Sequence, residues 1–92
     1  MSICPGMMVQ VPDEYFSSLH RTCLGLRPSA DVWVHDDSSP GLVYPHDHMI
    51  VLSTHETLAA RHNGQLYITD VCVATLDGLI GWIYDYNLEE VK

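Results

Sequence analysis

The chain contains few basic residues, and their scarcity excludes several classes of function. Its 92 residues include four Lys and Arg against twelve Asp and Glu, which gives a formal net charge of -8. Binding to nucleic-acid phosphates requires a cationic face, and four scattered basic residues cannot build one. The same acidity argues against docking on an anionic membrane. We therefore expect no nucleic acid and no membrane as partners. An acidic mimic of nucleic acid is a weaker alternative, and solubility explains the charge more simply.

Cysteines and long apolar runs are also scarce. Cys4, Cys23 and Cys72 are an odd set with no spacing typical of a metal site, whereas a small secreted domain usually carries an even set that forms disulfides. No uncharged apolar stretch approaches the length that crosses a bilayer, and the chain does not begin with the pattern of a signal peptide. We therefore expect reduced thiols in a cytoplasmic protein, with Cys72 as a small core residue.

The remaining composition is typical of one small globular domain over residues 1–92. Hydrophobic residues make up 47% of the chain and charged residues 17%, which is far from the composition of disordered proteins. A chain of this length buries about two-thirds of its extended surface, enough for one modest core. We find no internal repeat and no linker that would divide it.

Runs rich in β-branched and aromatic residues predict strands, and glycine-containing turns separate them. The predicted strands cover residues 7–11, 32–35, 49–53, 65–76 and 79–84. Asn63-Gly64 and Asp77-Gly78 match the two-residue type I′ turns of β-hairpins. Because the run over residues 65–76 is long for a straight strand of a small barrel, we expect it to bend near Thr69 and Asp70.

One segment has a helical pattern instead, over residues 12–24. Pro12 suits the first position of a helix, and Asp13 and Glu14 suit the positive end of the helix dipole. Gly25 would end the helix. Four apolar residues fall on one helical stripe: Tyr15, Phe16, Leu19 and Cys23.

The end of the chain, DVCVATLDGLIGWIYDYNLEEV over residues 70–91, has a recognisable order of elements. A strand, a tight turn, a second strand with Gly-Trp-Ile, a brief turn and a short final strand follow one another. This order resembles the closing strands of the Src-homology-3-like (SH3-like) small barrels of bacteria and phages. The resemblance covers about a quarter of the chain. It implies a mainly β, five-stranded SH3-like barrel with one short helix or long loop inserted after the first strand.

The resemblance also assigns the two faces of the strand over residues 79–84. In the family pattern the position of Ile83 points into the core, and Gly81 allows a crossing strand to approach closely. Trp82 and Tyr84 then lie on the outer face. Tyr84 replaces a proline that helps eukaryotic relatives to bind proline-rich peptides, so the resemblance does not extend to that ligand. The same pattern looks like that of phage accessory proteins, which implies a place in a phage particle or an infected bacterial cell.

More aromatic residues are present than one small core can hide, and they favour an interaction surface. This set comprises Trp33, Tyr44, Trp82, Tyr84 and Tyr86. Three acidic residues would steer a basic partner toward it: Asp36, Asp37 and Asp85. We therefore predict a non-enzymatic module that docks a protein partner or a second copy of itself. The alternative is that Trp33 and Trp82 only cover the ends of the barrel.

Six histidines raise a second possibility, a metal site. His46 and His48, two residues apart in a strand, would face the same way, and His35 or Asp37 would supply a third ligand for zinc or iron. A metal-binding protein or metal-dependent enzyme is therefore the alternative function. The His-x-His motif is weak, however, and histidines beside aspartates more often form solvated hydrogen bonds. We find no nucleophile elbow, glycosidase pair or phosphate loop, so we expect no catalytic residue and no cofactor.

Overall fold

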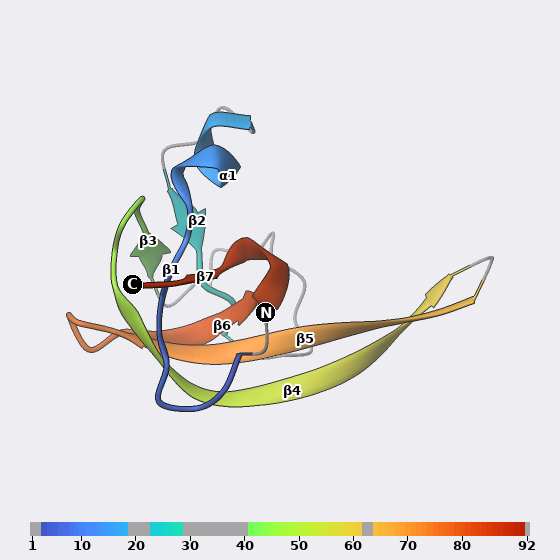
Figure 1. Cartoon of the computed structure of the whole chain (residues 1–92). Coiled ribbons are helices and arrows are strands. Elements are labelled where there is room, and N and C mark those ends of the chain that lie inside the picture. The colour runs from blue at the N-terminus through green and yellow to red at the C-terminus, as the bar shows by residue number, and fades with distance from the viewer. Residues whose placement is uncertain (1–2, 19–22, 29–40, 62–63, 92) are drawn as a thin grey trace.

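The computed structural model describes residues 3–18, 23–28, 41–61 and 64–91, which form a mainly β fold (Figure 1). Its main strands are β1 (Met8–Gln10), β4 (Met49–Arg61), β5 (Gly64–Thr75), β6 (Ile80–Tyr84) and β7 (Glu89–Glu90). They make one antiparallel sheet in the spatial order β6-β5-β4-β1-β7. The remaining elements are β2 (Leu24–Gly25), β3 (Leu42–Val43), the helix α1 (Asp13–Ser18) and the 3₁₀ helix η1 (Asp85–Asn87). The mainly β class and the five-stranded sheet confirm the prediction at this level.

The predicted strands over residues 7–11, 65–76 and 79–84 correspond to β1, β5 and β6 to within one residue at each end. β4 is longer than its pattern indicates. The apolar run ends near Ser53, yet the strand continues to Arg61 because the residues between them pair with β5. The strand predicted over residues 32–35 lies outside the described residues.

The predicted bend in β5 is not marked by any irregularity in strand pairing. Thr69 and Asp70 pair with β4 in a regular register, and the irregularity lies on the opposite strand, between Val51 and Ser53. Leu52 is the extra residue of this β-bulge, and 44% of it is exposed. Because a bulge bends its own strand and increases the local twist, the extra residue adds curvature to β4 at this point.

The turn between β5 and β6 contains three residues rather than the predicted two. The N–H of Thr75 donates to the carbonyl of Leu79 at 2.8 Å, and the N–H of Gly78 donates to the carbonyl of Thr75 at 3.0 Å. Gly78 has a φ of 88°. This is a type I turn closed by a glycine bulge, which requires a positive φ at the glycine alone. Gly64, expected in the other turn, is the first residue of β5.

The helix is shorter than predicted. α1 ends at Ser18, and Leu24 belongs to β2, where it pairs with Val43 of β3. Leu24 is buried among core residues, so strand pairing and tertiary burial outweigh the helical periodicity of the sequence at that end. Residues 19–22 lie outside the described part. Across that part, no helix reaches the length and apolar content that a membrane crossing needs.

The core is built by the inward faces of the sheet, with contributions from α1 and β2. Along β6, Gly81 and Ile83 are buried whereas Trp82 and Tyr84 are half-buried and Ile80 is exposed, as the predicted alternation requires. The buried apolar cluster contains Val9, Val11, Phe16, Leu24, Leu26, Val43, Met49, Val51, Val71, Val73, Ile83 and Leu88.

A second segment crosses β6 at Gly81 and adds to the sheet there. Arg27 and Trp82 exchange two backbone hydrogen bonds, of 2.9 and 2.8 Å, in an isolated antiparallel bridge. A Cβ atom on residue 81 would lie 2.6 Å from the Cβ of Leu26 and 3.2 Å from the carbonyl oxygen of Arg27. The absence of a side chain at residue 81 therefore permits this crossing, as the family resemblance implied.

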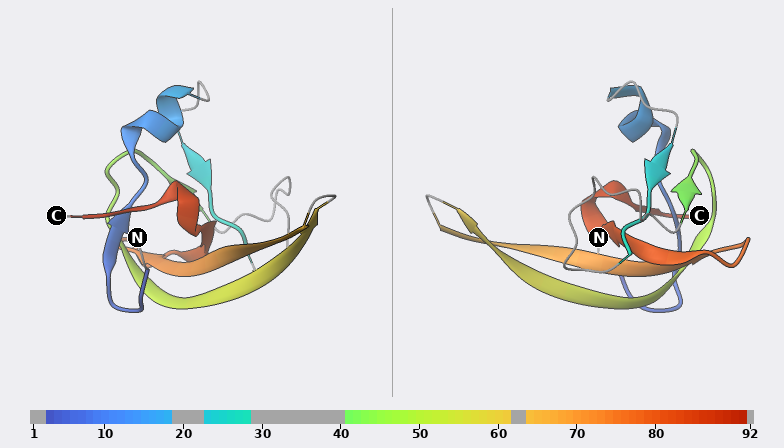
Figure 2. Two further views of the ribbon diagram at one scale, coloured as in Figure 1. Left: turned by 45° about the vertical axis from the view of Figure 1, so that its right-hand side comes forward. Right: turned by 180° about the vertical axis from the view of Figure 1, so that it is seen from behind.

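The β4–β5 hairpin extends well beyond the rest of the sheet. It projects to one side as a curved two-stranded ribbon in all three ribbon views (Figures 1 and 2). β6 pairs with β5 only from Asp70 to Ala74, and β1 pairs with β4 only at Met49 and Ile50. The outer half of the hairpin therefore has no third strand among the described residues.

The close approach at Gly81 gives the first prediction. We expect Gly81→Ala to lower the free energy of unfolding by about 1–3 kcal/mol, because the new methyl group overlaps Leu26 and backbone that cannot move freely. Denaturant unfolding followed by fluorescence measures this change. Gly78→Asn is the control, because nothing lies within 4 Å of a Cβ at residue 78 and Asn tolerates a positive φ. Equal stability of Gly81→Ala and the wild type would contradict the crossing.

Candidate protein-interaction surface

The end of β6 and the following η1 place two tyrosines one against the other. Strand alternation turns Tyr84 to the outer face, and the single turn of η1 returns the chain so that Tyr86 covers it. Their ring centroids are 5.2 Å apart and their planes differ by 9°, a stacked arrangement. Tyr84 is half-buried, whereas 68% of Tyr86 is exposed. An aromatic ring thus lies at the surface on a second ring that fixes its orientation.

A buried ion pair supports this stack from below. The guanidinium carbon of Arg27 lies 3.9 Å from the centroid of the Tyr84 ring, in a cation–π contact. The same guanidinium pairs with the carboxylate of Asp70, and each of these side chains is only 2% exposed. Residues paired across antiparallel strands project to the same face. Arg27 is the partner of Trp82, and Asp70 is the partner of Tyr84. The strand register therefore places these four side chains on the same face of the sheet.

The energetics of this pair are asymmetric. Two buried opposite charges contribute little net stability when both are present, but removing one leaves the other buried without compensation, at a cost of about 3–5 kcal/mol. The contact with Tyr84 adds roughly 0.5–2 kcal/mol. The Arg27–Asp70 pair therefore acts chiefly by fixing where Tyr84 lies, and through it where Tyr86 lies.

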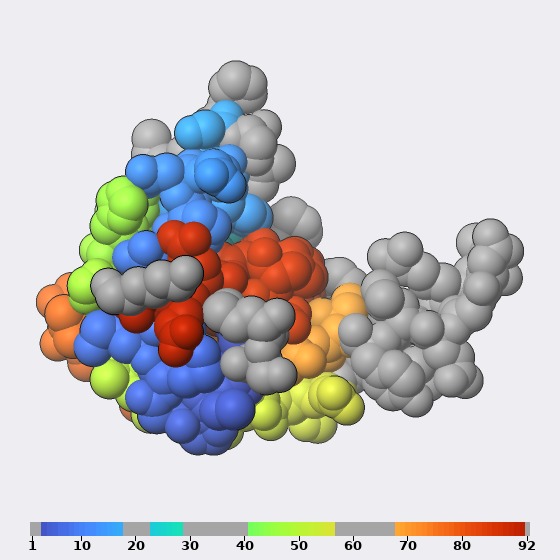
Figure 3. All heavy atoms as spheres, viewed as in Figure 1, coloured from blue at the N-terminus to red at the C-terminus, as the bar shows by residue number. Residues whose placement is uncertain are grey.

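Tyr15 of α1 is one of the groups that affect the pKa of the Tyr86 phenol. Loss of water around its ring raises the pKa of the Tyr86 phenol above its usual value, and the nearby Tyr84, Tyr15 and Asp85 raise it further, while Arg27 partly offsets this. Desolvation matters here although most of the side chain is exposed, because one ring face lies against Tyr84. Figure 3 shows η1 and α1 side by side on one face of the molecule.

Four of the predicted binding residues lie together on this surface. Trp82 is half-buried beside Arg27, and Asp85 is half-buried at the first position of η1. Together with Tyr84 and Tyr86 they occupy one continuous segment of β6 and η1.

The other predicted binding residues do not join this group. Tyr44 is 49% exposed in the turn between β3 and β4, and no ring contact links it to Tyr84 or Tyr86 in the described part of the chain. Trp33, Asp36 and Asp37 lie outside the described residues.

The histidines are not arranged as predicted. His46 and His48 precede β4 instead of sharing one of its faces. His46 has a φ of 68°, so it occupies the left-handed position of a turn, and its Nε2 lies 2.8 Å from the Oδ2 of Asp13. His35 is outside the described residues. Within the described ranges, no group of three or more His, Cys, Asp or Glu side chains is placed to hold a metal ion.

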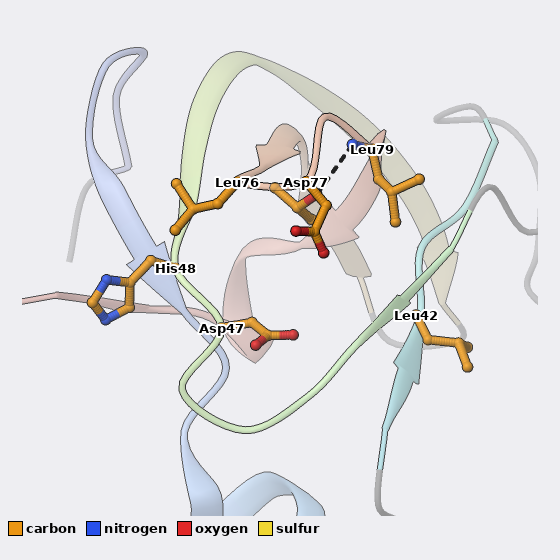
Figure 4. Close-up of a pocket in the computed structure, with 7 residues that line it drawn as sticks. Leu42, Asp47, His48, Leu76, Asp77 and Leu79 are labelled. Carbon is orange, nitrogen blue, oxygen red and sulfur yellow. Dashed lines mark hydrogen bonds between the residues drawn. The ribbon is translucent and has the colours of Figure 1, made fainter.

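A hollow of about 150 Å³ opens between the turn after β5 and the segment before β4 (Figure 4). Its lining comprises Leu42, Asp47, His48, Thr75, Leu76, Asp77 and Leu79. Two polar side chains of this lining, those of Asp47 and Thr75, stabilise the turns themselves. Asp47 accepts a hydrogen bond from the N–H of Tyr44 at 2.9 Å, and Thr75 accepts one from the N–H of Leu79 at 3.1 Å. These bonds are local, so we assign the hollow to turn structure.

Cys72 matches its interpretation as a small buried residue. It is 9% exposed, and burial raises the pKa of its thiol, an effect that a hydrogen bond with Ser53 partly reduces. A raised pKa keeps the thiol protonated and unreactive at neutral pH.

Sequence reasoning missed Tyr15 as a member of this surface and Arg27 and Asp70 as the buried pair beneath it. Asp70 carried a usable signal, because a lone carboxylate inside an otherwise apolar strand run is rarely buried unless it is paired. Its partner Arg27 is 43 residues away along the chain, and no local pattern connects the two.

A comparison of the chain with protein-family models, curated proteins and solved structures finds no match.

The buried ion pair generates the second prediction. We expect Asp70→Asn to destabilise the protein by about 3–5 kcal/mol, because the Arg27 charge stays buried without its counterion. The double variant Arg27→Met, Asp70→Asn should lose less stability than the sum of the single variants Arg27→Met and Asp70→Asn. Denaturant unfolding of the four proteins forms a double-mutant cycle. Asp13→Asn is the control, because its contact with His46 is solvent-exposed and should contribute less than about 1 kcal/mol. Additive losses in the cycle would show that the two groups do not interact.

Proposed function

We propose that this chain is an SH3-like barrel that acts as a non-enzymatic module and docks a protein partner on the surface formed by Tyr84, Tyr86 and Tyr15. Two features support the barrel. β5, a three-residue turn, β6, η1 and β7 follow one another in the order that the family resemblance implies. The segment at Leu26 and Arg27 also pairs with the outer edge of β6 and so extends the sheet around the core.

The observation that carries the docking proposal is the exposed ring of Tyr86 stacked on Tyr84. Tyrosine supplies a large amphipathic contact area with only two side-chain torsions to immobilise. Here the stack restricts those torsions before a partner arrives, and the buried Arg27–Asp70 pair holds its lower ring. Such preorganisation reduces the entropic cost of binding.

The charge around this surface favours a basic partner. Asp85 lies within the segment, and Asp13 and Glu14 lie on the first turn of α1 beside Tyr15. Arg27, by contrast, is buried and paired with Asp70, so the pair adds no net positive charge beneath this surface. Lysine- or arginine-bearing peptides would bind faster at low ionic strength, since complementary charge mainly raises the association rate.

The third prediction tests the tyrosine stack directly. A display library of random peptides selected on the wild-type protein should enrich lysine- or arginine-containing sequences, whose affinities calorimetry then measures. We expect Tyr86→Ala to weaken these peptides about tenfold or more, as expected for a central aromatic contact. Tyr44→Ala, which removes an exposed tyrosine elsewhere, should leave affinity within about twofold. Equal weakening by both variants, or no enriched peptide at all, would overturn the proposal.

The fourth prediction concerns Trp82, which is half-buried beside Arg27. We expect Trp82→Ala to reduce affinity for the same peptides while the protein stays folded. Circular dichroism and thermal unfolding report the fold independently of binding. A variant that no longer unfolds cooperatively would assign Trp82 to the core and remove it from the surface.

A further inference from the structure

The outer half of the β4–β5 hairpin carries a long strand edge. β4 and β5 pair continuously from Ser53 with Cys72 to Arg61 with Gly64. On its other side, β4 pairs with β1 at Met49 and Ile50, and Val51 exchanges two backbone hydrogen bonds with the segment before β1, to the carbonyl of Met7 and from the N–H of Gly6. Beyond Val51, no described strand pairs with this side of β4. We call residues 53–61 of β4 the free edge.

The hydrogen bonds of the sheet fix which backbone groups point toward the free edge. The N–H of Trp82 donates to Arg27, away from β5. Because N–H directions alternate along antiparallel strands, the N–H of Cys72, opposite Trp82, points toward β4, and so do the other even-numbered residues of β5. Their β4 partners are the odd-numbered residues from 53 to 61. The N–H groups of the even-numbered residues therefore point outward: Thr54, Glu56, Leu58 and Ala60.

An unpaired edge of this length is a template for another strand. Proteins usually protect such edges with charges, prolines or a covering segment. Residues 53–61 contain no proline, and Glu56 and Arg61 are their only Asp, Glu, Lys or Arg residues. A two-stranded ribbon without a third strand is also only marginally stable in water. Both considerations indicate that the free edge has a partner strand.

The charge distribution identifies which partner the edge suits. The chain as a whole carries a formal charge of -8, whereas residues 53–69 contain one acidic residue, Glu56, and one basic residue, Arg61, and sum to zero. Two copies of the chain repel each other across most of their surfaces, but not here. An antiparallel edge is also self-complementary about a two-fold axis, since each copy offers the same alternation of outward N–H and C=O groups.

We propose that the free edge of β4 pairs antiparallel with the same edge of a second copy of this chain, so that the two hairpins form a four-stranded ribbon. A two-fold axis at Leu58 pairs the outward N–H and C=O groups of Glu56 with those of residue 60 in the second copy. This contact lies away from the Tyr84–Tyr86 stack, so it is independent of the docking proposed there.

Proline at an outward position tests the pairing. Glu56→Pro removes a donor that points to the free edge and leaves the β4–β5 ladder intact. Sedimentation equilibrium up to about 1 mM protein, where weak association is still populated, should show a dimer for the wild type. Because each dimer loses two hydrogen bonds, we expect the variant to raise the dimer dissociation constant about thirtyfold or more. Glu56→Thr, which removes the charge but keeps the N–H, is the matched control and should still dimerise.

Hydrogen exchange on the wild-type protein gives a second readout that needs no variant. The amides of Thr54, Glu56, Leu58 and Ala60 should exchange slowly at high protein concentration and faster on dilution, while those of the inward-pointing residues 53, 55, 57 and 59 should change less. A wild-type protein that stays monomeric up to about 1 mM would overturn the proposal. So would a dimer whose affinity Glu56→Pro leaves unchanged, or outward amides whose exchange does not depend on concentration.

Discussion

Arg27 joins the segment between β1 and β4 to the main sheet in two ways, through its backbone to Trp82 and through its side chain to Asp70. The backbone bridge requires a strand to cross β6 at Gly81, and the missing side chain at that position makes the crossing possible. The crossing in turn brings Leu26 into the core at 0% exposure. The packing of the core and the position of the surface aromatics thus depend on one residue and its partners.

The same interaction shapes the electrostatics of the molecule. The chain has four Lys and Arg residues. One of them, Arg27, forms a buried ion pair with Asp70 and a cation–π contact with the ring of Tyr84. Around the stack, the exposed charges that the structure describes are acidic: Asp13 and Glu14 on α1, and Glu89 and Glu90 on β7. A buried cation beneath an aromatic pair, with carboxylates around it, is suited to a basic partner and unsuited to a phosphate backbone.

The two ends of the long β5 strand therefore have different roles in our proposals. From Asp70 to Ala74, β5 lies between β4 and β6 and supports the tyrosine stack through Asp70. Before Asp70 its one partner among the described strands is β4, and the two form the projecting hairpin. Docking of a basic partner uses the first end and self-association uses the second, so one strand connects both surfaces without either covering the other.

The sequence by itself determined what depends on local pattern. It predicted β1, β5 and β6 to within one residue at each end and the alternation of side chains along β6, because strand periodicity is encoded in adjacent residues. The family resemblance, rather than the periodicity, implied that Ile83 faces the core and that Trp82 and Tyr84 face outward. Only the tertiary structure decided the rest. Leu24 became a strand residue by pairing with Val43, β4 continued to Arg61 by pairing with β5, and Arg27 met Asp70 across 43 residues. Each of these outcomes depends on a partner far away in the chain, and the periodicity of a short segment carries no information about that partner.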